Sequence, residues 1–190
     1  MTDSPAAPEP TARYEALSHA ALAALALDGN DPAAAGQSGA QWAELSRRLR
    51  ESIGGLVALS TGSEETWQGG SGDAMRALLG KAAGWLAETS SVSAAVGEAV
   101  GGQAEVAARA RADMPAPVGF DPAAMIRSAA ASGNLAELAG LSFTMDARRA
   151  EADAARQKAI DVLRTRDTAL RGLVPGHEFP AVPALGAEPA

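Results

Sequence analysis

Residues 71–113 keep a helical pattern without a single proline. Apolar side chains recur in this stretch mostly at steps of three or four residues, the spacing that gathers them on one face of a helix. They are Met75, Leu78, Leu79, Ala82, Trp85, Leu86, Val92, Val96, Val100 and Val106. At about 1.5 Å per residue, the predicted helix is roughly 65 Å long. Met114-Pro115-Ala116-Pro117 ends it, because proline cannot continue the helical hydrogen-bond ladder.

Glycine is frequent inside this helix. Each glycine costs up to about 1 kcal/mol relative to alanine, or on the order of 4 to 5 kcal/mol for the set. The set is Gly80, Gly84, Gly97, Gly101 and Gly102. A helix of this kind is not stable alone, so packing must offset the cost. Since small residues let another backbone come close, we predict neighbouring helices, from this chain or another.

A second amphipathic stretch, residues 38–60, precedes the long helix. Its apolar seam is Trp42, Leu45, Leu49, Ile53, Leu56 and Leu59 or Ser60, and Glu44, Arg47, Arg48, Arg50 and Glu51 fall largely outside it. The intervening turn, residues 61–70, contains Trp67-Gln68-Gly69. Ser71 and Asp73 then cap the following helix with an acidic first turn. Together the two stretches predict a long antiparallel helical hairpin.

Shorter patterns flank the hairpin. Residues 12–27 predict a first helix, which Asp28-Gly29-Asn30-Asp31-Pro32 ends. We expect its apolar face to meet a partner, through Tyr14, Leu17, Leu22 and Leu25. Asp121-Pro122 opens a short helix that runs to residue 131 and that Gly133-Asn134 closes. A final helix is expected near residues 144–171, lying along the hairpin.

The predicted fold is therefore all-α, an elongated helical bundle built on the hairpin. One helical domain is expected at residues 12–173. Prolines among small and polar residues predict a disordered arm at residues 1–11 and a disordered, proline-rich tail at residues 174–190.

Composition excludes several classes of function. With 16 Lys and Arg against 23 Asp and Glu, the net charge of -7 disfavours binding to nucleic acid. No run approaches the roughly 20 apolar residues of a transmembrane helix. No positive side chain precedes Arg13, so a Sec signal peptide is not expected. The absence of cysteine removes disulfides and thiolate metal sites from consideration.

Residues with catalytic or metal-binding chemistry are sparse. His19 and His177 are far apart in the chain and are expected at the surface. The segment Asp28-Gly29-Asn30-Asp31 lacks the alternating ligands and closing Glu of a calcium loop. Gly69-Gly70-Ser71-Gly72 lacks the lysine and preceding strand of a phosphate loop. We therefore expect no catalytic residues, no cofactor and no metal.

Taken alone, Trp67-Gln68-Gly69 is compatible with an ordinary turn in which Trp plugs the hairpin end. Its register is more specific, because Met75, Trp85 and Leu86 follow Trp67 by 8, 18 and 19 residues. This pattern resembles the PPE (Pro-Pro-Glu) family of type VII secretion, in which a Trp-x-Gly turn precedes Met and a Trp-Leu pair. Trp42 upstream and the Met114–Val118 helix stop extend the resemblance over residues 37–118.

The chain also departs from that family. Pro8-Glu9, followed by Ala12-Arg13-Tyr14, resembles the family's opening without its second proline. The family's Tyr-x-x-x-Asp/Glu export signal is absent, because Ser18 stands four residues after Tyr14, the sole tyrosine. The departures suggest a divergent or non-mycobacterial relative.

The resemblance implies a non-enzymatic secretion substrate or export partner. It would bind a small helical PE-like or Trp-x-Gly protein that supplies the signal, with a secretion chaperone as a further partner. The chain would be cytoplasmic before export and secreted or at the cell surface afterwards. The alternative is a self-associating structural or scaffold protein of the cell envelope. An operon that encodes a small helical protein beside a secretion ATPase would favour the first interpretation.

Overall fold

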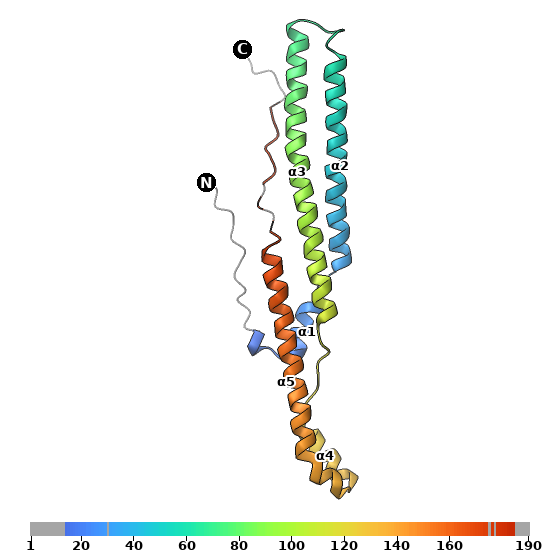
Figure 1. Cartoon of the computed structure of the whole chain (residues 1–190), viewed down its shortest axis with the longest axis vertical. Coiled ribbons are helices and arrows are strands. Elements are labelled where there is room, and N and C mark those ends of the chain that lie inside the picture. The colour runs from blue at the N-terminus through green and yellow to red at the C-terminus, as the bar shows by residue number, and fades with distance from the viewer. Residues whose placement is uncertain (1–13, 30, 175, 177, 185–190) are drawn as a thin grey trace. The chain divides into compact units, whose positions relative to one another are not determined.

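The computed structural model describes residues 14–29, 31–174, 176 and 178–184, and within these ranges it contains helices and no strand. The helices are η1, a 3-10 turn (Tyr14–Ala16), α1 (His19–Leu27), α2 (Pro32–Gly62), α3 (Gly70–Asp113), α4 (Pro122–Ser132) and α5 (Leu135–Arg171). Figure 1 shows α2 and α3 as an antiparallel hairpin, which confirms the all-α prediction. No helix in the described ranges is long and apolar enough to cross a bilayer.

The chain divides into two compact units, and the helical domain expected at residues 12–173 stays a prediction. Among the described residues, the hairpin unit comprises residues 31–105, 173, 174, 176 and 178–184, and the α5 unit comprises residues 14–29 and 106–172. Helix α3 contributes to both. The predicted arm, residues 1–11, lies outside the described residues.

The beginning of α2 corrects the sequence interpretation. Asp31-Pro32 was expected to end the first helix, and the second was expected from residue 38. Instead, Asp31 is the N-cap of α2, and its Oδ1 accepts hydrogen bonds of 3.0 Å from the amides of Ala33 and Ala34. Pro32 occupies the first turn, where no amide proton is needed. The range predicted for α3 is confirmed to within one residue.

The helices of the α5 unit differ more from expectation. Helix α1 begins only at His19, because the Ser18 hydroxyl accepts a hydrogen bond from the amide of Ala21 and caps it there. Helix α4 matches its predicted range to within one residue and ends at Ser132, with Gly133 as its C-cap at φ +64°. Helix α5 begins at Leu135 instead of residue 144, since Asn134 is its N-cap. Tyr14, Leu22, Ala26, Ala159, Ile160 and Leu163 form the core of this unit.

Candidate interaction surface on the hairpin

Helices α2 and α3 approach each other closely at glycines. A Cβ on Gly39 would lie 3.0 Å from the backbone nitrogen of Gly101 and 3.0 Å from the carbonyl oxygen of Gly97. Both neighbours are backbone atoms, so neither can rotate away as a side chain would. The prediction that small residues admit a second backbone is thus met within the chain, by α2.

A buried hydroxyl fixes the two helices further along the hairpin. Ser46 on α2 is fully buried, and its hydroxyl donates a 2.8 Å hydrogen bond to the carbonyl oxygen of Ser90 on α3. A buried polar group without such a partner would destabilise the fold, so this bond favours one register of the two helices.

The hairpin turn depends on two glycines with different roles. Gly69 has φ +93°, a left-handed conformation that side chains rarely adopt. Gly72 is buried, and a Cβ there would overlap the carbonyl oxygen of Trp67. The backbone of the Trp67-Gln68-Gly69 turn can therefore fold down onto the first turn of α3 only because position 72 is glycine.

Arg76 holds the same turn from α3. Its guanidinium donates to the carbonyl oxygen of Trp67 at 3.1 Å and to the Ser63 hydroxyl at 3.4 Å, and it pairs with the Asp73 carboxylate. Arg76 was not singled out from the sequence. Its spacing of three residues from Asp73 is a helical ion-pair signal, but its contact with Trp67 depends on the turn geometry.

Apolar side chains near this end of the hairpin are exposed. Trp67 is 44% exposed, Leu59 61% and Met75 40%. Gln68 and Gly69 are also exposed. The Trp67 backbone is therefore fixed by Arg76 and Gly72 while its indole remains accessible. This differs from a tryptophan that plugs the end of a hairpin.

Trp42 and Trp85 lie elsewhere on the hairpin and contact the C-terminal segment. The rings of Trp42 and Phe179 have centroids 5.7 Å apart, and the Trp85 indole N–H donates to the carbonyl oxygen of Pro180 at 3.1 Å. Leu86 is half-buried. Where the sequence predicted a disordered tail, the structure gives residues 178–184 a defined path along the hairpin (Figure 1).

The residues expected to face a partner from the first helix are mostly enclosed. Tyr14 is 6% exposed and Leu22 is fully buried, both in the core with α5. Leu17 packs against the same core, which leaves Leu25, at 42% exposed, as the accessible member. The expectation fails because α5 itself covers this apolar face.

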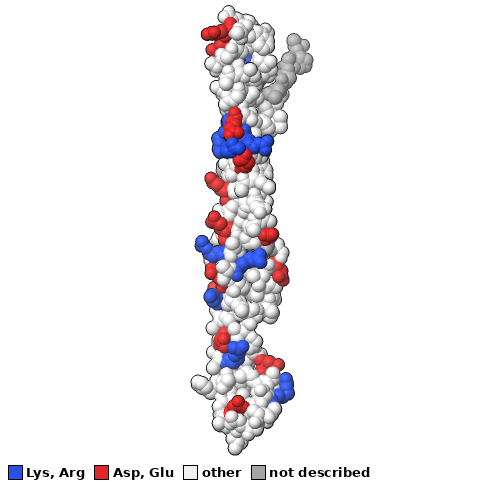
Figure 2. All heavy atoms as spheres, turned by 90° about the vertical axis from the view of Figure 1, so that its right-hand side faces the viewer, with Lys and Arg blue, Asp and Glu red and all other residues white. Residues whose placement is uncertain are grey.

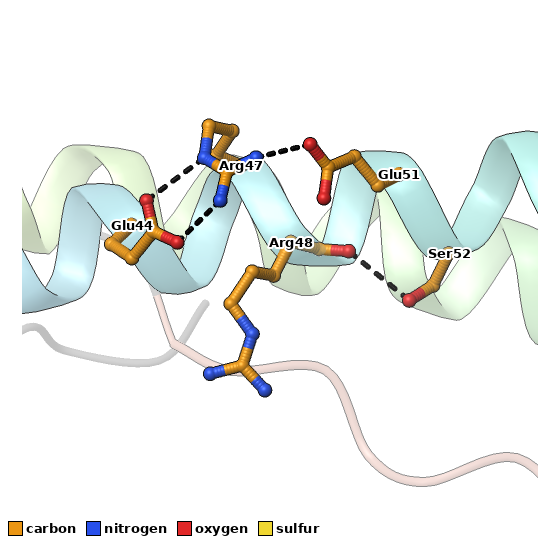
Figure 3. Close-up of polar contacts among 5 residues, drawn as sticks. All are labelled: Glu44, Arg47, Arg48, Glu51 and Ser52. Carbon is orange, nitrogen blue, oxygen red and sulfur yellow. Dashed lines mark hydrogen bonds and ion pairs between the residues drawn. The ribbon is translucent and has the colours of Figure 1, made fainter.

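Charges on α2 form a local network. Figure 3 shows Arg47 between Glu44 and Glu51, with Arg48 pointing away from both. Arg47 pairs with both carboxylates, and its hydrogen bonds to Glu44 lower the pKa of that carboxyl. Figure 2 shows positive and negative side chains gathered together on the hairpin. The two signs offset each other, so this cluster offers no single-sign surface to a charged ligand.

The described residues contain few side chains that could act in catalysis or bind a metal. His19 is buried, not at the surface as expected, and its Nε2 lies 3.2 Å from the carbonyl oxygen of Pro115. His177 lies outside the described residues. Among those described, no group of three or more His, Asp or Glu residues could hold a metal ion.

No protein-family model and no curated protein matches the sequence.

Proposed function

We propose that the chain is a non-enzymatic, PPE-like substrate or export partner of a type VII secretion system. It acts by helix-to-helix binding to a small helical protein, of the PE-like or Trp-x-Gly kind, that carries the export signal. The complex forms in the cytoplasm and is exported to the surface or the medium. The sequence resemblance at residues 37–118 supplies the secretion context.

The accessible indole of Trp67 is the observation that supports binding most strongly. Arg76 and Gly72 hold its backbone, yet 44% of the residue is exposed. Leu59 and Met75 add exposed apolar surface near the same end of the hairpin. Exposed apolar surface that is held rigidly is typical of protein interaction sites, and tryptophan is a frequent energetic centre of such sites.

The enclosed position of Tyr14 supports a signal carried by another chain. Its side chain is buried, and its hydroxyl donates to the Asp167 carboxylate. Ser18, four residues on, is the N-cap of α1 rather than an acidic residue of a signal. The only tyrosine of the chain therefore has a structural task in the α5 unit.

Co-expression with each small helical protein encoded beside this chain tests the proposal. Light scattering should show a heteromeric complex, and Trp67→Ala should weaken binding by about tenfold or more. Phe143→Ala is the matched control, because Phe143 is 79% exposed on α5 in the other unit. A monodisperse monomer that binds none of these proteins would contradict the proposal. A homo-oligomer that Trp67→Ala disrupts would favour the alternative of a self-associating envelope protein.

A further inference from the structure

The C-terminal segment is attached to the hairpin at several points. Gln103 Nε2 donates to the carbonyl oxygen of Leu173 at 3.2 Å, and a Cβ on Gly102 would lie only 3.0 Å from the Leu173 Cδ2. The Trp42–Phe179 and Trp85–Pro180 contacts follow further along the segment. All these residues belong to the hairpin unit. Gly102, which costs helix stability in α3, thus makes room for Leu173.

We propose that Trp42 and Trp85 form a binding site for an extended Phe-Pro segment, and that residues 178–184 of this chain are its intramolecular ligand. The site goes beyond the proposed export function and does not depend on it. The segment would cover these two tryptophans until a competing chain displaces it.

The chemistry of the contacts explains why such a segment fits. The rings of Phe179 and Trp42 are tilted by 31° with their centroids 5.7 Å apart, a separation typical of favourable aromatic pairs. Proline has no amide proton but keeps its carbonyl, which the donor-only Trp85 indole can bind. Pro180-Ala181-Val182-Pro183 also has the Pro-x-x-Pro spacing of segments that dock into aromatic-lined grooves.

Covalent attachment decides which ligand occupies the site. A tethered segment competes at an effective concentration on the order of millimolar, so weak contacts suffice to keep it bound. Weakening the contacts of residues 178–184 with the hairpin should allow the same segment, added as a free peptide, to bind at the site. Phe179 is 48% exposed, so its truncation removes the ring contact without removing a buried core residue.

The test uses the full chain, whose three tryptophans provide separate indole N–H signals in a ¹⁵N-labelled NMR spectrum. Trp67→Phe assigns the signal of the hairpin end. Phe179→Ala should shift the Trp42 and Trp85 signals and leave that of Trp67 in place. Phe143→Ala is the matched control, because it also truncates an exposed phenylalanine, 79% exposed on α5 in the other unit, and it should shift none of the three.

A synthetic peptide of residues 176–184 then tests the site directly. It should bind the Phe179→Ala chain about tenfold more tightly than the wild-type chain, which its own tail protects. It should also return the two shifted signals towards their wild-type positions, and a peptide with alanine for Phe179 should not. Unmoved Trp42 and Trp85 signals in Phe179→Ala, or failure of the peptide to move them back, would overturn the proposal. Wild-type signals that depend on protein concentration would show that the segment docks on a second copy and would overturn the intramolecular assignment.

Discussion

Gly39 on α2 and Gly97 on α3 face each other reciprocally. A Cβ on either would lie 3.0 Å from the carbonyl oxygen of the other. A Cβ on Gly97 would also lie 3.1 Å from the amide nitrogen of Ala43. The hairpin therefore has its closest helix-to-helix contact where both backbones lack side chains, and this contact separates glycines that are needed from glycines that are tolerated.

Gly97→Ala should lower the free energy of unfolding by about 1–3 kcal/mol, since the added methyl group must push two backbones apart. Gly101→Ala is the control, because nothing lies within 4 Å of a Cβ at that position. It should be neutral or raise stability by up to about 1 kcal/mol through helix propensity. Urea denaturation followed by circular dichroism measures both, and equal effects of the two substitutions would contradict the close packing.

Gly72→Ala should disturb the hairpin turn, because its methyl group would overlap the backbone carbonyl of Trp67. We expect a loss of stability of about 1–3 kcal/mol and a changed fluorescence of Trp67, measured in a chain with Trp42→Phe and Trp85→Phe. Gly70→Ala, at a position with nothing within 4 Å, should leave the emission spectrum unchanged. A Gly72→Ala spectrum identical to the parent's would show that the turn does not depend on this contact.

Tyr14 should titrate above its ordinary pKa of 10.0 in the folded chain. Burial raises the pKa most, and the hydrogen bond and negative charge of Asp167 raise it further, while Arg166 opposes them. The folded state thus holds the phenol proton more tightly than the unfolded state does. The resulting stabilisation is fully present below pH 10 and is lost as the pH rises through the folded pKa.

Because Tyr14 is the only tyrosine, ultraviolet absorbance of tyrosinate reports its titration without interference from another. The midpoint should fall back towards 10.0 in concentrated urea and should also fall in Asp167→Asn. An equal midpoint in the folded and unfolded chains would contradict the enclosed position of this side chain.

Local signals in the sequence predicted the helices best. The pattern of α3 and its proline stop gave that helix to within one residue, and Asp121-Pro122 with Gly133 gave α4. The same Asp-Pro signal opens α2 at Asp31-Pro32, where the sequence pattern predicts only the end of the preceding helix. Asn134, which the pattern places in the turn that closes α4, caps α5. In both cases one short segment ends one helix and caps the start of the next.

Contacts between distant residues could not be predicted in this way. Nothing local distinguishes Gly97, where a Cβ would meet the backbone of α2, from Gly101, where a Cβ would have open space. The contact of Trp42 with Phe179 depends on where the chain returns after α5. The enclosure of Tyr14 and Leu22 depends on α5 covering α1. The turn motif was correctly placed between the helices, but the exposure of Trp67 required the structure.

The most direct test of the proposed export compares the amount of this chain in the culture medium and on the cell surface of its host with and without the type VII secretion ATPase. We predict that deletion of the ATPase abolishes the exported chain while the cytoplasmic chain accumulates. Deletion of the small helical partner should do the same, and reintroduction of either gene should restore export. An exported amount that is unchanged without the ATPase, or a chain that never leaves the cytoplasm of the intact host, would contradict the proposed export.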